Sequence, residues 1–234
     1  MSKNHGYALR RDEIETYFDR TAVEAWRRLT STEPVSGIRA TVRAGRERMR
    51  STLLSWLPAD LNGATVLDAG CGTGAASVEL ARRGARVLAI DLSAQLIELA
   101  RERCPADLGS GSVEFRVGDM LTSDAGVVDF VVAMDSVIHY GPDDAARVLV
   151  SLARRTRRSI VCTFAPRTPS LALMHAVGRL LPSTSDRAPA IVPVSQATLS
   201  RKIGAAIGPD WRFGRTERVS SAFYKSQALE LVRG

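Results

Sequence analysis

Short apolar runs alternate with amphipathic segments between residues 65 and 164, and few folds accommodate such a pattern. The runs are rich in valine and isoleucine, which is typical of strands buried on both faces of a parallel sheet. The segments between most of them have the apolar spacing of helices. We therefore predict an α/β fold with a doubly wound, mostly parallel sheet. The predicted strands are 65–69, 86–90, 113–117, 128–134 and 159–164, and the predicted helices are 74–83, 94–103 and 143–155.

The region before the first strand has a different pattern. Apolar residues at three- and four-residue intervals predict amphipathic helices over 10–29 and 38–57, and Pro58 ends the second one. Residues 1–60 are therefore predicted to form a helical arm on a domain of residues 61–234. Such an arm could cover a site on the domain.

The region after residue 164 also departs from the alternation. It predicts a helix that ends at Pro182, a loop rich in proline and serine, and a helix over 195–207. The last two apolar segments, 211–219 and 222–231, lie two residues apart and predict an antiparallel hairpin at the sheet edge. The hairpin brings the predicted sheet to seven strands. Residues 165–193 are predicted to cover the substrate.

Composition narrows the class of protein. The chain has 234 residues, of which 45% are hydrophobic and 24% charged, the balance of a globular protein. Three widely spaced cysteines, the absence of an apolar leader and the absence of a long apolar segment predict a cytoplasmic location. The net charge is +7, with an acidic middle between basic ends. The basic ends are either a solvated surface or a surface that meets an anionic substrate or membrane.

A glycine-rich loop follows the first predicted strand and opens the next helix, at residues 70–74. Gly70, Gly72 and Gly74 allow a sharp turn and a close approach to a ligand, and the N–H groups at the helix start favour an anionic group. Asp91 ends the second strand, where a carboxylate can accept hydrogen bonds from both hydroxyls of a ribose. The loop after the third strand offers Asp119 to an adenine amino group and an apolar residue to its ring.

A purely structural interpretation of these residues is available. The glycines could form a tight turn without a ligand, and Asp91 could cap the helix that begins near Ser93. The convergence of three loops with suitable chemistry favours a nucleotide-type site.

The combination of D-A-G-C-G-T-G, a strand-terminal Asp91 and G-D-M resembles the class I S-adenosylmethionine-dependent methyltransferases. The G-x-G-x-x-G of dinucleotide dehydrogenases is a weaker match, because the third glycine comes one residue sooner here. The resemblance implies that the glycine loop contacts the methionine moiety of the cofactor, Asp91 the ribose, and Asp119 with Met120 the adenine. The cofactor-binding residues implied in this way are Asp68, Gly70, Cys71, Gly72, Gly74, Asp91, Leu92, Asp119, Met120 and Met134.

Segments outside the cofactor loops carry a more specific resemblance. The chain is similar to the magnesium-protoporphyrin IX O-methyltransferase family in YFDRTAVEAWRRL, IRATVRAGRERM, MDSVIHY, SIVCTFAPRTP, MHAVGRLLP and RVSSAFYKSQALEL. The resemblance implies methylation of one propionate of magnesium protoporphyrin in the synthesis of chlorophyll or bacteriochlorophyll. It assigns the magnesium to the substrate, so no protein metal site is predicted. It also suggests contact with the porphyrin-binding subunit of magnesium chelatase.

One position departs from the family. Cyanobacterial and plant members have a tyrosine after the first tryptophan and basic pair, in I-Y-G-D, where this chain has Leu29, Thr30, Ser31 and Thr32. The role of that tyrosine cannot be transferred. Tyr17 and Thr30 are the candidates to replace it.

His139 is the predicted catalytic residue. The resemblance places a catalytic or orienting histidine just past the fourth strand, although a histidine there could simply bond a neighbouring loop. A propionate has a pKa of about 4.3 and is ionised at neutral pH, so its methylation needs no strong base. An orienting role is therefore favoured over that of a base.

Other residues are candidates for the substrate site. Arg167 and Arg187 could pair with propionates, or could be surface arginines. His175 has helical spacing with apolar neighbours and is either a substrate contact or a packing residue.

Alternative functions remain open at this stage. The same fold could methylate a quinone or another small apolar acceptor, or the chain could be a module that carries the pigment between enzymes. Nucleic acid is not expected as a partner, because MDSVIHY stands where base methyltransferases have N/D-P-P-Y/F. The mixed charges of the first helix allow at most a peripheral membrane contact.

Overall fold

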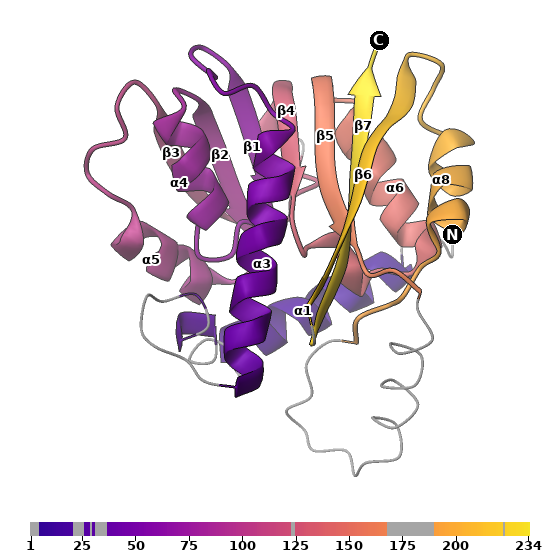
Figure 1. The fold of residues 1–234 in the computed structure, drawn as a ribbon, viewed down its shortest axis with the longest axis horizontal. Helices are drawn as coiled ribbons and strands as arrows, with labels where there is room; N and C mark the ends of the chain where they lie inside the picture. The colour runs from indigo at the N-terminus through magenta and orange to yellow at the C-terminus, as the bar shows by residue number, and fades with distance from the viewer. Residues whose placement is uncertain are drawn as a thin grey trace.

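The computed structural model describes residues 5–20, 26–28, 30, 37–122, 125–167, 190–221 and 223–234. These residues form a seven-stranded sheet with the order β3-β2-β1-β4-β5-β7-β6, covered by helices on both faces (Figure 1). The strands are β1 Thr65–Ala69, β2 Arg86–Asp91, β3 Ser112–Val117, β4 Val128–Ala133, β5 Thr156–Phe164, β6 Trp211–Ser221 and β7 Tyr224–Arg233. The helices are α1 His5–Arg20, α3 Gly37–Ser55, α4 Ala75–Arg82, α5 Ala94–Arg103, η2 Val137–His139, α6 Pro142–Ala153 and α8 Gln196–Gly204.

The sheet has the predicted topology. Strands β1 to β5 are parallel, β7 runs antiparallel to β5, and β6 runs antiparallel to β7 at the edge. The doubly wound α/β class and the closing hairpin are therefore confirmed. Strand β1 pairs with β2 on one side and with β4 on the other, so the strand order reverses there. In open α/β sheets this reversal marks the carboxyl edge at which ligands bind.

Each face of the sheet carries its own apolar core. On one face, Met49 and Leu53 of α3 pack with Leu80 of α4. On the other, Leu149 of α6 packs with Leu199 of α8. Figure 1 shows α3 in front of the sheet and α6 and α8 behind it. Because both faces are covered, the strands are apolar along most of their length, which explains the alternation in the sequence.

The arm follows the sequence prediction in part. Of the helix predicted over 10–29, the structure describes α1 and a helical turn at 26–28. The second predicted helix is α3, which packs along the hairpin of β6 and β7. The helix predicted to end at Pro182 lies outside the described residues. The division at residue 60 and the covering role of 165–193 stay predictions.

Gly45 allows α3 to approach the hairpin closely. A Cβ atom at this position would lie 2.5 Å from Oγ of Ser221 and 2.6 Å from Cδ1 of Tyr224. Oγ of Ser221 also donates a hydrogen bond to the carbonyl of Thr41, one turn earlier on α3. The helix therefore sits against the hairpin at a distance that no larger residue permits.

We expect Gly45→Ala to lower the free energy of unfolding by roughly 1–3 kcal/mol, because the added methyl overpacks this contact. The midpoint of urea unfolding measures the change. Gly204→Ala is the matched control in α8, since a Cβ there would meet only Cε2 of Phe213 at 3.8 Å. The control should leave stability unchanged or raise it. An equal change in the free energy of unfolding of the two variants would show that the close approach of α3 to the hairpin does not make Gly45 necessary for stability.

Candidate active site

The glycine loop forms a tight turn between β1 and α4. The backbone N–H groups of Gly70 and Cys71 both donate to the carbonyl of Ile90, at 2.8 and 3.0 Å. Gly70, Gly72 and Gly74 have φ angles of 85°, 54° and 77°, in the left-handed region that favours glycine. The turn is therefore fixed to the end of β2 by its own backbone.

The three glycines have different surroundings. A Cβ on Gly70 would lie 2.4 Å from Cβ of Ser136, and one on Gly74 would lie 2.8 Å from Cε1 of Phe115. A Cβ on Gly72 would meet nothing within 4 Å. Gly70 and Gly74 are thus required by packing, whereas Gly72 borders open space. This open space, at the turn that leads into α4, suits the methionine end of the predicted cofactor.

Asp91 connects the first two loops. Its Oδ2 accepts from the N–H of Gly72 at 2.8 Å, and its Oδ1 accepts from the N–H of Ser93 at 3.0 Å. The cap of α5 is the Ser93 hydroxyl, which accepts from the N–H of Leu96, so Asp91 is not the cap itself. Burial raises the pKa of Asp91, and the backbone N–H groups partly offset this rise. Each carboxylate oxygen retains a lone pair for a ribose hydroxyl.

Asp68 lies beneath the glycine loop. Its side chain is buried, and its Oδ2 accepts from Oγ of Ser77 on α4 at 2.6 Å. Burial raises the pKa of Asp68 to about 6, although the Ser77 hydrogen bond opposes this rise and Asp91 adds to it. Asp68 therefore ties the end of β1 to α4.

The third loop is covered by the arm. Oδ1 of Asp119 accepts from the hydroxyl of Tyr7 at 2.7 Å and from the N–H of Leu121 at 2.8 Å. Nη1 of Arg11 lies 3.6 Å from Oδ2 of the same carboxylate, and the Tyr7 ring stacks on Tyr140 with centroids 5.1 Å apart. No local pattern predicts these contacts, because Tyr7 and Asp119 are 112 positions apart. The i, i+4 spacing of Tyr7 and Arg11, which places both on one face of α1, is a signal that the sequence analysis did not use.

The remaining predicted cofactor residues line or support these loops. Met120 is 7% exposed and belongs to the core, with Leu92 packed against the same cluster. Cys71 and Met134 are partly buried and pack against the other core cluster. Their side chains thus pack against the two core clusters, and their contact with a cofactor stays a prediction.

His139 sits in the short helix η2 after β4. It is 8% exposed, and its ring lies edge-on to Phe18 of α1 with centroids 6.2 Å apart. Phe18 in turn contacts Trp26, at 5.6 Å between centroids. Tyr17 lies on the arm next to this pair, with its ring 5.2 Å from that of Phe18. The arm therefore places an aromatic row, formed by Tyr17, Phe18 and Trp26, next to the predicted catalytic histidine, with Phe18 in contact with it.

The predicted substrate residues are placed less uniformly. The hydroxyl of Thr30 donates to the carbonyl of Trp26 and accepts from Nη1 of Arg103 on α5, at 2.6 and 2.7 Å. Arg167 is exposed, and its backbone N–H donates to the carbonyl of Val194. His175 and Arg187 lie outside the described residues. The structure therefore places Phe18, the neighbour of Tyr17, against His139, whereas Thr30 is bound by Arg103 of α5.

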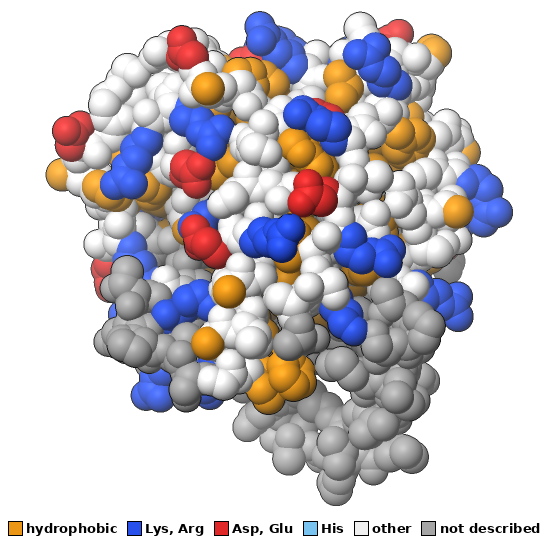
Figure 2. Space-filling model, in the orientation of Figure 1, with side chains coloured by type: hydrophobic (Ala, Val, Ile, Leu, Met, Phe, Trp, Pro, Cys, Tyr) orange, Lys and Arg blue, Asp and Glu red, His pale blue; other side chains and the backbone are white. Residues whose placement is uncertain are grey.

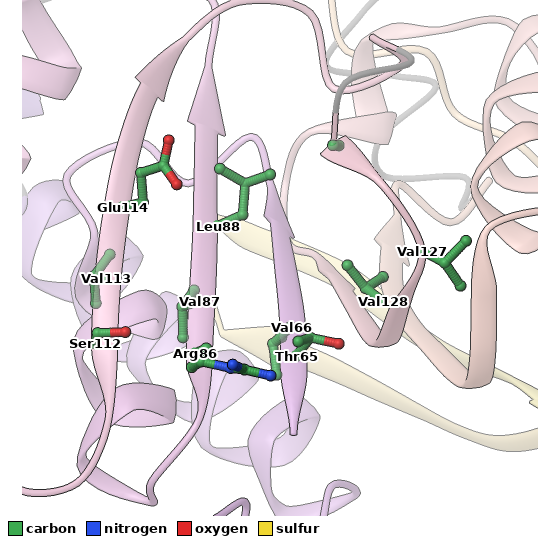
Figure 3. A pocket seen from close by; sticks show the side chains of 11 residues that line it. Thr65, Val66, Arg86, Val87, Leu88, Ser112, Val113, Glu114, Val127 and Val128 are labelled. Atoms are coloured by element: carbon green, nitrogen blue, oxygen red, sulfur yellow. The ribbon is translucent and has the colours of Figure 1, made fainter. Parts of the chain in front are cut away.

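A separate groove lies at the amino-terminal ends of the parallel strands, opposite the carboxyl ends that carry the site. It has a volume of about 390 Å³ and extends over the starts of β1, β2 and β3, where Thr65, Arg86 and Ser112 are the first residues (Figure 3). The predicted cofactor-binding residues and His139 lie at or after the carboxyl ends of the strands. The groove is therefore distinct from the site described above.

In the described part of the chain, no three histidine, cysteine or acidic side chains are grouped so that they could hold a metal ion. The site is thus built from glycine turns, carboxylates and aromatic rings.

The fold and the loops around Gly72 and Asp91 define a class I S-adenosylmethionine-dependent methyltransferase. A general methyltransferase-domain model matches residues 66–159, and a model described as the C-terminus of magnesium-protoporphyrin IX methyltransferase matches residues 133–233. The chain belongs to the magnesium-protoporphyrin O-methyltransferase family. It is 48% identical to the Rhodobacter capsulatus enzyme of that name, over 96% of this chain and 97% of the relative.

Two further relatives support this assignment. The magnesium-protoporphyrin O-methyltransferase of Synechocystis is 30% identical over 94% of this chain and 95% of its own length. The crystal structure of the Synechocystis magnesium protoporphyrin IX methyltransferase with bound S-adenosylhomocysteine superposes with a TM-score of 0.81 at 30% identity. It covers 94% of this chain and 98% of that one.

The raised pKa of Asp68 predicts a pH-dependent stability. The folded protein holds this proton up to about pH 6, whereas the unfolded chain releases it near pH 4. The free energy of unfolding therefore falls as the pH rises through this window, by up to roughly 3 kcal/mol, and then stays constant. Asp68→Asn removes the charge and keeps an oxygen that can accept from Ser77.

We expect the urea midpoint of Asp68→Asn, relative to the unchanged protein, to be higher at pH 8 than at pH 4.5. Asp60→Asn, at an exposed carboxylate, serves as the control. A difference that does not change with pH would contradict the raised pKa.

Gly72 and Gly63 allow strain to be separated from ligand binding. Both have positive φ, at 54° and 75°, and a Cβ on either would meet nothing within 4 Å. Alanine should cost each about 1–2 kcal/mol of stability. Only Gly72→Ala should also weaken S-adenosylhomocysteine binding, by at least about tenfold, because its methyl enters the cofactor space. Calorimetric titration of both variants makes this comparison, and equal affinities would exclude a ligand at Gly72.

Proposed function

We propose that this protein transfers a methyl group from S-adenosylmethionine to a propionate carboxylate of magnesium protoporphyrin IX and forms the monomethyl ester. The observation that carries the proposal is the 48% identity to the Rhodobacter capsulatus magnesium-protoporphyrin O-methyltransferase, which extends over nearly all of both chains. The shared length includes the arm and the hairpin as well as the cofactor loops. The arm and the hairpin are the parts in which methyltransferases of one fold can differ in the acceptor that they prefer.

Methylation of a quinone is the weaker alternative. The ubiquinone biosynthesis O-methyltransferase of Xanthomonas axonopodis is 39% identical, but over only 51% of this chain and 53% of its own. A half-length match of this kind fits a shared methyltransferase core. The full-length relatives favour the porphyrin.

Several residues are suited to hold the cofactor. The Asp91 carboxylate can take the ribose hydroxyls, and the space beside Gly72 can take the methionine end. The Asp119 carboxylate, which already accepts from the hydroxyl of Tyr7, would also accept from the adenine amino group. When bound, S-adenosylmethionine supplies an electrophilic methyl group on a positively charged sulfur.

The acceptor end of the site needs little proton chemistry. A propionate is already an anion at neutral pH, so the residues around it have to align it and exclude water. His139 is nearly buried under Phe18, and Trp26 extends this aromatic surface. An aromatic row of this kind suits a flat apolar ring system. We assign His139 an orienting role toward the carboxylate.

The setting of the reaction in the cell is also a proposal. A cytoplasmic location with at most peripheral membrane contact, and substrate delivery by the porphyrin-binding subunit of magnesium chelatase, rest on the sequence. Among the described helices, none combines the length and apolarity needed to cross a bilayer. On the face over α3 and the hairpin, basic side chains are dispersed with acidic ones among them (Figure 2).

The direct test is incubation of the purified protein with S-adenosylmethionine and magnesium protoporphyrin IX, with product detection by chromatography and mass. The expected product is a monomethyl ester that forms only when both reagents are present. A preparation that binds S-adenosylhomocysteine yet yields no ester would reject the porphyrin acceptor. Assays with quinone precursors would then follow.

We expect His139→Ala to lower kcat by about 10- to 100-fold to a similar extent between pH 6 and pH 9, because the acceptor stays ionised over this range. His139→Gln, which keeps hydrogen-bonding capacity without a titrating ring, should retain more activity than the alanine variant. The pH profiles of kcat for the three proteins provide the measurement. A loss confined to acidic pH would instead identify His139 as a base.

A further inference from the structure

The loop that carries His139 begins with an unusual backbone conformation. Asp135, directly after β4 and Met134, has a φ of 55°, and it is the one non-glycine residue with positive φ in the described part of the chain. Such residues are uncommon, and they persist where surrounding contacts fix them. The contacts of Asp135 therefore bear on how this loop is held.

Three elements converge on the Asp135 carboxylate. Nη1 of Arg46 on α3 lies 2.5 Å from Oδ2, and the hydroxyl of Tyr224 at the start of β7 donates to Oδ1 at 3.2 Å. Thr163 on β5 accepts from the Asp135 N–H at 2.7 Å, and its hydroxyl is 3.3 Å from Oδ1. The side chain of Asp135 is 8% exposed and that of Arg46 is 24% exposed. An ion pair this sheltered is screened less than a surface pair.

Arg46 also reaches the arm. Its guanidinium lies 4.4 Å from the centroid of the Trp26 ring, in a cation–π contact. Trp26 contacts Phe18, which covers His139. The guanidinium of Arg46 thus contacts both Asp135, at the start of the loop after β4, and the aromatic row that lies against His139, at the end of that loop.

The next residue faces the glycine loop. Ser136 packs against Gly70 so closely that a Cβ on Gly70 would lie 2.4 Å away, and its buried hydroxyl has no hydrogen-bond partner among the described residues. The glycine loop itself is held by the bonds of Gly70 and Cys71 to Ile90 and of Gly72 to Asp91. None of those bonds passes through Asp135. The hydrogen bonds that hold the cofactor side and the acceptor side are therefore separate, and the two sides meet where Ser136 packs on Gly70.

We propose that Asp135 and Arg46 form a positioning pair that fixes residues 135–139 and the aromatic row on the acceptor side of the site. The pair acts through Ser136, His139 and Trp26 and does not itself take part in methyl transfer. Its effect on turnover rests on the proposed function. Its effect on the loop does not.

Asp135→Asn tests the pair with little change of shape, because asparagine also tolerates the left-handed conformation. We expect kcat for ester formation to fall about 10- to 100-fold, whereas the Kd for S-adenosylhomocysteine stays within about threefold. Arg46→Gln should have a similar effect, and the double variant should be no worse than either single one, because the two residues act as a unit. Arg48→Gln, an exposed arginine on the same helix, is the control and should match the unchanged protein.

Hydrogen exchange supplies a readout that does not depend on activity. The amides of residues 134–140 should exchange at least about tenfold faster in Asp135→Asn and Arg46→Gln, whereas those of 66–74 should be unchanged. Unaltered exchange in 134–140, or additive losses in the double variant, would overturn the proposal. So would a loss of cofactor affinity as large as the loss of kcat. If the unchanged protein forms no ester, the proposed function fails, and the exchange data still decide the positioning pair.

Discussion

The pairing of β1 with both β2 and β4 is the constraint on which the site depends. Because these strands are parallel, their carboxyl ends meet at one edge, and the strand order reverses beside β1. Three segments therefore lie together at this edge, each directly at the end of its strand: the glycine loop, Asp91, and the residues from Met134 to His139. Gly70 makes this possible at close range, since its missing side chain admits Ser136.

Around this edge, the two halves of the site are supported differently. In the cofactor half, the glycine loop is held by hydrogen bonds at the end of the sheet, such as those from Gly72 to Asp91 and from Gly70 to Ile90, and the arm adds the bond from Tyr7 to Asp119. The acceptor half depends on side chains from the arm and the hairpin, namely Arg46 and Tyr224. This division agrees with the chemistry, because many methyltransferases share a donor whereas the acceptor distinguishes them. For a carboxylate acceptor, the protein mainly has to align the reacting groups and exclude water.

The sequence anticipated the sheet well because its signal is local. The five parallel strands, helix α5 and the hairpin follow from apolar runs and their spacing, and the observed bounds differ by three residues or fewer for each of them. The arm was harder to predict. Of the helix expected over 10–29, the structure describes α1, which begins five residues earlier at His5, and helical residues at 26–28. Its contacts with Asp119 and His139 join residues about 110 to 120 positions apart, and no local pattern encodes them.

By itself, the sequence determined the fold class, the glycine turn and the strand-terminal Asp91, because hydrophobic periodicity and the conformational freedom of glycine are properties of short segments. Tertiary structure alone decided which partners these residues have. Asp119 is bound by Tyr7, Thr30 by Arg103, and Asp135 by Arg46 and Tyr224. Such pairs form only when packing brings distant segments together and removes water from between their charges, and that depends on the whole chain.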